Sequence, residues 1–99
     1  MARLSTHVLD TARGRPAAGI EVRLYDASRA LLRTVATDAD GRALVDDNLA
    51  PGDYELIFAV HASDFLNEVV IRFRITKGET KYHVPLLISP YGYTTYRGS

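Results

Sequence analysis

Apolar residues recur at every second position in several short segments, and this alternation is the feature that most constrains the fold. A period of two places alternate side chains on opposite faces of an extended strand. The chain therefore builds strands that each pack one face inward. Four stripes follow the pattern: Ile20, Val22 and Leu24; Tyr54, Leu56, Phe58 and Val60; Val69, Ile71, Phe73 and Ile75; and Val84, Leu86 and Ile88.

Turn-forming residues divide the chain into segments too short for typical helices. A parallel α/β architecture is disfavoured because no crossover helix fits between the strands. About seven to eight short strands at this spacing predict an all-β fold, an antiparallel β-sandwich of two sheets. We expect one short helical turn at most, at residues 61–67, where Ser63 or Asp64 can cap it.

Length, charge and cysteine content exclude several classes of protein. The 99 residues suffice for a single domain, residues 1–99. Lys plus Arg and Asp plus Glu number 12 each, so the net charge of zero gives no field to attract nucleic acid or an anionic membrane. The absence of cysteine excludes disulfides and thiolate chemistry. We expect a cytoplasmic location, because the N-terminus lacks the apolar core of a signal peptide.

Apolar residues also occur on strand faces that should meet solvent, at Ile57, Ala59, Val70 and Leu87. Residues 91–96 add three tyrosines, which are enriched at interfaces because they combine apolar area with a hydrogen-bonding tip. Every protein of this size exposes some apolar atoms. The two features together nevertheless favour a homo-oligomer.

Two of the three histidines fall in the middle of predicted strands, where histidine gains nothing obvious from packing. His7 shares a face with Ser5, and His83 shares a face with Lys81, each away from the buried stripe. Each is either a hydrogen-bonded surface histidine or a functional one. His61 ends a strand and reads as a loop histidine. The spacing of the three matches no local zinc pattern, so no metal site is expected.

Arg42 and the C-terminal residues each leave two interpretations open. Arg42 is either a solvated turn residue or a fixed guanidinium whose forked donors bind a planar, carbonyl-rich or anionic ligand. Residues 96–99 either fray or are tethered and bring a hydroxyl into a site. No nucleophile elbow or phosphate-binding glycine loop is present. Four aspartates are expected in turns: Asp38, Asp40, Asp46 and Asp47.

Both ends of the chain resemble one protein family. Residues 4–19, LSTHVLDTARGRPAAG, resemble the opening of the 5-hydroxyisourate hydrolases, the transthyretin-related proteins. Residues 82–99, YHVPLLISPYGYTTYRGS, resemble that family's closing signature, whose Tyr-Arg-Gly-Ser ending separates the hydrolases from hormone-carrying transthyretins. Residues 37–42 and 50–56 match as well, although many prealbumin-like sandwiches share such motifs. The resemblance covers essentially the whole chain.

The resemblance implies a transthyretin-like sandwich assembled as a homotetramer, a dimer of dimers, with active sites in a channel where the dimers face each other. It implies that the catalytic residues are His7, Arg42, His83 and Ser99, and that Tyr96, Arg97 and Gly98 bind substrate or position the tail. These residues include the ones that packing left unexplained. The chain departs from the family after Val60, where roughly a turn or two of helix is missing.

The implied reaction is the hydrolysis of 5-hydroxyisourate to 2-oxo-4-hydroxy-4-carboxy-5-ureidoimidazoline in urate degradation. One of His7 and His83 would act as general base and the other as acid or orienter, in an order that stays open. Arg42 would bind ring carbonyls and stabilise the oxyanion, and Ser99 would hydrogen-bond substrate or water. No metal or organic cofactor is implied. The alternative is a non-enzymatic transthyretin-like module that binds a small ligand.

Overall fold

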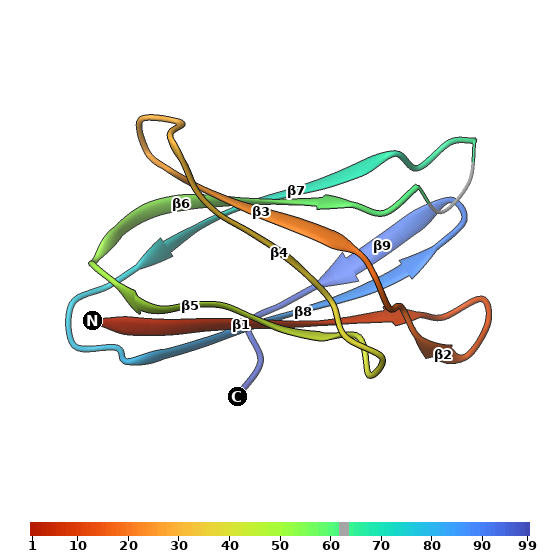
Figure 1. Ribbon diagram of the computed structural model, residues 1–99, viewed down its shortest axis with the longest axis horizontal. Coiled ribbons are helices and arrows are strands. Elements are labelled where there is room, and N and C mark those ends of the chain that lie inside the picture. Colours follow the sequence, from red (N-terminus) through yellow and green to blue (C-terminus); the bar gives the residue numbers. More distant parts are fainter. Residues whose placement is uncertain (62–63) are drawn as a thin grey trace.

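The computed structural model describes residues 1–61 and 64–99, and its strands form two sheets packed face to face (Figure 1). The described residues hold nine strands, more than the sequence predicts, because β2 is a two-residue pairing without an apolar stripe. The predicted all-β sandwich is confirmed. The strands are β1 (Ala2–Asp10), β2 (Arg15–Pro16), β3 (Glu21–Asp26), β4 (Leu31–Ala36), β5 (Arg42–Leu49), β6 (Gly52–Ala59), β7 (Glu68–Ile75), β8 (Lys81–Ser89) and β9 (Gly92–Thr95).

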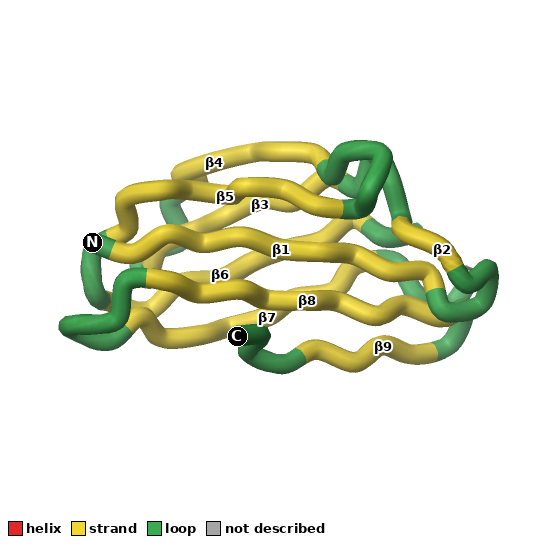
Figure 2. Tube along the Cα trace, turned by 90° about the horizontal axis from the view of Figure 1, so that it is seen from below, coloured by secondary structure: helices red, strands yellow, loops and turns green. Residues whose placement is uncertain are grey.

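The first sheet has β1 at its centre, between β5 and β8, with β9 beyond β8. Figure 2 shows these strands side by side in one layer, with β4, β3, β6 and β7 in the other. The pairing of the strands is mostly antiparallel, as predicted, and the pairing of β1 with β8 is the parallel exception. A parallel pair needs a long crossover connection. Here the strands of the second sheet supply that connection in place of a helix.

The second sheet is antiparallel throughout, in the order β4-β3-β6-β7. Its inward stripes meet those of the first sheet in one cluster of buried apolar side chains. Most members of the four predicted stripes are buried, and the others, such as Ile20 and Ile71, pack against the cluster. The alternation in the sequence therefore assigned the inward faces correctly.

The aspartates divide between confirmed and wrong predictions. Asp38 does stabilise a turn, because its Oδ1 accepts the backbone N–H groups of Asp40 and Arg42 at 2.9 and 3.0 Å. Asp46 instead lies within β5, where its carboxylate is buried and forms an ion pair of 3.2 Å with Arg33. Its short polar side chain resembles a turn signal, but pairing with β1 extends the strand through this position.

The connection between β6 and β7 is closed by a hydrogen bond of 3.0 Å from the backbone N–H of His61 to the carbonyl of Asn67. His61 is exposed and adopts a left-handed backbone conformation, with φ of 44°. The described residues of the predicted helical turn, 61 and 64–67, form no helix. Ser63, a predicted cap, lies outside the described residues. Within residues 1–61 and 64–99, no helix is long and apolar enough to cross a membrane.

We predict that Leu24→Ala lowers the free energy of unfolding by about 2–5 kcal/mol, because Leu24 is completely buried between the sheets. Leu31→Ala is the matched control, since Leu31 is 54% exposed on the neighbouring strand β4. Its effect should stay within about 0.5 kcal/mol. Urea denaturation measures both values. Equal losses in the two variants would contradict the assigned core.

Candidate active site

The register of β1 with its two neighbours gathers polar side chains on the outer face of the first sheet. Thr6 on β1 is buried, so Ser5 and His7 point the other way. β5 pairs Arg42 with His7, and β8 pairs His83 with Ser5. Residues from three distant parts of the sequence therefore lie next to each other because the strands align in this register.

The chain after β9 turns back over β8 and does not fray (Figure 2). The backbone N–H of Gly98 donates to the carbonyl of His83 at 2.7 Å. The Arg97 guanidinium donates to the Lys81 carbonyl at 3.1 Å and lies 4.2 Å from the centre of the Tyr82 ring. Residues 96–99 are therefore tethered to β8, which is the second of the two interpretations of the tail.

Gly98 lies so close to His83 that no larger residue fits between the tail and the imidazole. A Cβ at Gly98 would lie 2.8 Å from Cδ2 of His83 and 3.3 Å from Cγ of Pro85. Real Cβ atoms do not approach other atoms this closely without displacing them. Glycine at this position therefore lets the tail backbone press against the ring.

A cavity of about 360 Å³ opens on this face, and three of the predicted catalytic residues line it, namely Arg42, His83 and Ser99. His7 is adjacent through its pairing with Arg42 but is not among the lining residues. Tyr96 is exposed and lies outside the lining. The remaining lining residues are Arg3, Ser5, Thr6, Asp38, Ala43, Leu44 and Lys81.

Each imidazole is held by a hydrogen bond through one nitrogen. Nε2 of His7 lies 2.9 Å from the carbonyl oxygen of Asp40. A carbonyl only accepts, so neutral His7 carries its proton on Nε2 and has its lone pair on Nδ1. Nδ1 of His83 lies 2.9 Å from Oγ of Ser5. Ser5 was not among the predicted site residues, although its place on the same strand face as His7 was the signal available.

Burial lowers the pKa of His83 below the ordinary histidine value of 6.5, and the nearby His7, Arg42 and Lys81 lower it further. Both causes disfavour the imidazolium, because a charge loses hydration when it is buried and is repelled by like charges. His83 is therefore neutral at pH 7. A neutral imidazole can accept a proton or donate a hydrogen bond, depending on which nitrogen carries the hydrogen.

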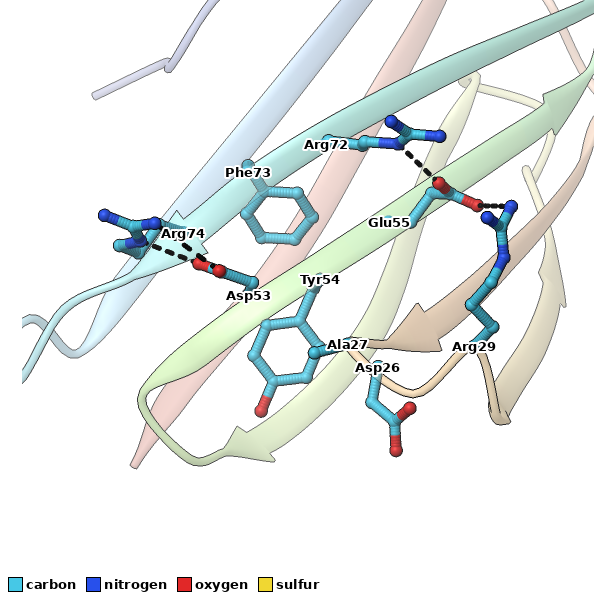
Figure 3. A pocket seen from close by; sticks show the side chains of 9 residues that line it. All are labelled: Asp26, Ala27, Arg29, Asp53, Tyr54, Glu55, Arg72, Phe73 and Arg74. Carbon is cyan, nitrogen blue, oxygen red and sulfur yellow. Dashed lines mark hydrogen bonds and ion pairs between the residues drawn. The ribbon is translucent and has the colours of Figure 1, made fainter.

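A larger hollow of about 540 Å³ lies on the second sheet, away from the histidines (Figure 3). Its charges neutralise one another: Arg72 donates to Glu55 at 2.8 Å, Arg74 donates to Asp53 at 2.7 Å, and Arg29 lies 3.6 Å from Glu55. None of the predicted site residues lines this hollow.

The described part of the chain contains no group of three or more His, Asp or Glu side chains placed to hold a metal ion. The cavity lining includes the imidazole of His83, the guanidinium of Arg42 and serine hydroxyls, together with the charged side chains of Asp38 and Lys81. Such groups transfer protons and bind carbonyl oxygens, which suits the hydrolysis of a polarised amide.

The two-sheet sandwich with its parallel central pair defines a transthyretin-like protein. Sea bream transthyretin, solved in complex with thyroxine, superposes with a TM-score of 0.86 at 25% identity, covering 96% of this chain and 93% of that one. The model of the HIUase/Transthyretin family matches residues 4–98. The chain belongs to the HIUase/Transthyretin family.

Among members of that family, the similarity to hydrolases is higher. The 5-hydroxyisourate hydrolase 2 of Rhizobium meliloti (strain 1021) is 48% identical, across 98% of this chain and 96% of the relative. The structure of Klebsiella pneumoniae 5-hydroxyisourate hydrolase superposes with a TM-score of 0.88 at 38% identity and covers both chains completely.

We predict that Arg42→Gln raises the pKa of His83, because the substitution removes one of the positive charges that oppose the imidazolium. Arg13→Gln is the control, since its exposed side chain lies on the turn after β1. NMR titration of the imidazole measures both values, and His83 in the unaltered protein should titrate below pH 6.5. An unchanged titration in Arg42→Gln would contradict the assigned proximity.

Proposed function

We propose that this protein hydrolyses 5-hydroxyisourate to 2-oxo-4-hydroxy-4-carboxy-5-ureidoimidazoline, a step of urate degradation, at the cavity on the first sheet. The observation that carries the proposal is that Arg42, His83 and Ser99 line one cavity beside His7. The hydrolases named among its relatives match nearly the whole chain. The protein is an enzyme of the hydrolase class.

His7 and His83 serve proton transfer and substrate orientation in this proposal. Opening the ring requires that water lose a proton as it attacks the amide carbon and that the leaving nitrogen gain one. A neutral imidazole performs the first of these tasks near pH 7. His83 is held neutral by burial and by neighbouring cations, and neutral His7 has its lone pair on Nδ1.

Arg42 and Ser99 bind the substrate and the charge that develops on it. Within the described residues, the Arg42 guanidinium has no ion pair, in contrast to the arginines of the larger hollow. Its forked donors therefore remain available for the ring carbonyls and for the oxyanion of the transition state. Ser99 lines the same cavity, where its hydroxyl can bond substrate or water.

The remaining tail residues position this serine. Gly98 lets the backbone lie against His83, and Arg97 fixes the tail through the Lys81 carbonyl and through Glu79, 3.3 Å away. Tyr96 is exposed in the single chain, and we assign it to contact with substrate or with a second subunit.

We further propose that the chain acts as a single domain, residues 1–99, in a cytoplasmic homotetramer built as a dimer of dimers. The strands β7 and β9 end their sheets along the same side of the sandwich, which leaves two unpaired edges for a second copy (Figure 2). Exposed Val70 and Tyr93 lie on these edge strands. Exposed Leu44 borders the cavity, where a second dimer would cover it.

The tetramer predicts a sedimenting mass four times the 11.0 kDa of the chain at micromolar concentration. Burial of exposed apolar side chains and edge strands drives the assembly. Analytical ultracentrifugation measures the mass directly. A monomer at all concentrations would contradict the proposed assembly.

The alternative is a binding module that holds a small ligand in the same cavity without reaction. A direct assay separates the two: urate oxidase generates 5-hydroxyisourate, and its ultraviolet decay is followed with and without the protein. Faster decay with the protein supports the hydrolase, whereas an unchanged decay favours the binding module.

We predict that His83→Ala and His7→Ala each lower kcat by about 10²–10⁴-fold in this assay, the usual contribution of a general acid or base. The matched control is His61→Asn, because this exposed loop histidine lies outside the cavity and asparagine tolerates its left-handed backbone. His61→Asn should retain full kcat. Unaltered kcat in both His83→Ala and His7→Ala would contradict the assigned site.

A further inference from the structure

The hydroxyl of Ser5 contacts a ring nitrogen of His83. Ser5 lies on β1 two residues before His7, and the parallel register places it directly opposite His83 on β8. Its Oγ is 2.9 Å from Nδ1 of His83, in a partly buried position. Residues at the two ends of the chain are thus joined at the edge of the cavity that both of them line.

The direction of this hydrogen bond follows from the partners available to the hydroxyl. Within the described residues, Ser5 Oγ has no other hydrogen-bond partner than Nδ1 of His83. If Nδ1 carried the hydrogen, the serine proton would have no acceptor in the described protein. The serine proton has an acceptor when the hydroxyl donates to an Nδ1 that carries no hydrogen. Neutral His83 then carries its hydrogen on Nε2.

The opposite side of the ring is also held. The tail backbone at Gly98 lies against the Cδ2 edge, with no space for a Cβ, and its N–H bonds the carbonyl of His83. The imidazole is therefore fixed between a hydroxyl on β1 and the tail. With Nδ1 occupied by Ser5, Nε2 is the nitrogen left to reach a bound ligand.

We propose that Ser5 is a positioning residue, whose hydroxyl donates to Nδ1 of His83, fixes the ring, and leaves Nε2–H to donate a hydrogen bond to the substrate. This proposal rests on the proposed function and deepens it, because it assigns the two histidines different roles. His83 becomes the orienting hydrogen-bond donor. His7, whose Nε2–H is held by the Asp40 carbonyl, becomes the general base through Nδ1.

The protons balance in this assignment. His7 Nδ1 takes a proton from water as the water oxygen bonds to the amide carbon, and charge develops on the carbonyl oxygen, which His83 Nε2–H and Arg42 stabilise. The carbon–nitrogen bond then breaks, and the proton on His7 passes to the leaving nitrogen. His83 keeps its hydrogen throughout, so no imidazolate forms.

The charged groups around His83 favour its role as a neutral donor. His7 on β1, Arg42 on β5 and Lys81 on its own strand all face it and oppose a second proton on the ring. Among the residues that line the cavity, Asp38 has an acidic side chain, and Arg3 adds a further cation. The Ser5 variants leave these charged groups in place. A change in the pKa of His83 in such a variant therefore reports the loss of the Ser5 hydroxyl.

Ser5→Ala removes the hydroxyl, Ser5→Thr keeps it on a residue that suits a strand, and Ser28→Ala deletes a serine hydroxyl from the exposed turn after β3 as the control. Two-bond ¹H–¹⁵N NMR of the full chain reports which nitrogen of each imidazole carries hydrogen, and His83→Gln assigns the signals. We expect a bare Nδ1 and a protonated Nε2 in His83 of the unaltered protein. A protonated Nδ1 overturns the proposal.

Ser5→Ala should raise the pKa of His83, because the neutral ring loses a donor to Nδ1. It should lower kcat about tenfold with KM within about twofold, the size expected for one orienting hydrogen bond. Ser5→Thr should restore both values and Ser28→Ala should change neither. Wild-type titration and kcat in a folded Ser5→Ala variant overturn the proposal. If the unaltered protein does not accelerate the decay of 5-hydroxyisourate, the proposed function fails, while the NMR result on Ser5 still stands.

Discussion

Eight backbone pairings join β1 to β8, from Arg3 opposite Lys81 to Asp10 opposite Ile88, and the site depends on their register. Because side chains alternate between faces, a slip of one residue would bury His83 and expose the apolar stripe beside it. The cost of exposing Val84 and Leu86 therefore locks the imidazole on the outer face. The packing of the core therefore determines that His83 lies on the outer face, where the candidate site is.

The same strand pair explains why only part of the site followed from the sequence. Alternation is a local signal, and it correctly placed His7 on the face opposite the buried residues of its strand, which are Leu4, Thr6 and Val8. No local signal specifies which strands pair, so the parallel alignment of β1 with β8 was missed. The contact between Ser5 and His83 was missed with it, since it follows from that alignment. The family resemblance supplied the candidate residues, but it did not give their partners.

Two effects at the cavity both lower the pKa of the His83 imidazole. Burial beneath the tail removes water from His83, and three neighbouring positive or ionisable groups repel a proton from it. In the proposed reaction, the same positive groups would attract the negative charge that develops on the carbonyl oxygen of the substrate. The environment that keeps His83 neutral is therefore also suited to an oxyanion. The paired arginines of the larger hollow lack this property, because their charge is already neutralised.

The most direct test is a crystal structure of the protein with an unreactive, planar analogue of 5-hydroxyisourate. The ring should lie in the cavity of the first sheet, with a carbonyl oxygen within hydrogen-bonding distance of the Arg42 guanidinium and of Nε2 of His83. His7 Nδ1 should face the position of the attacking water. An analogue bound in the hollow between Glu55 and Arg74, with the histidine face unoccupied, would contradict the account.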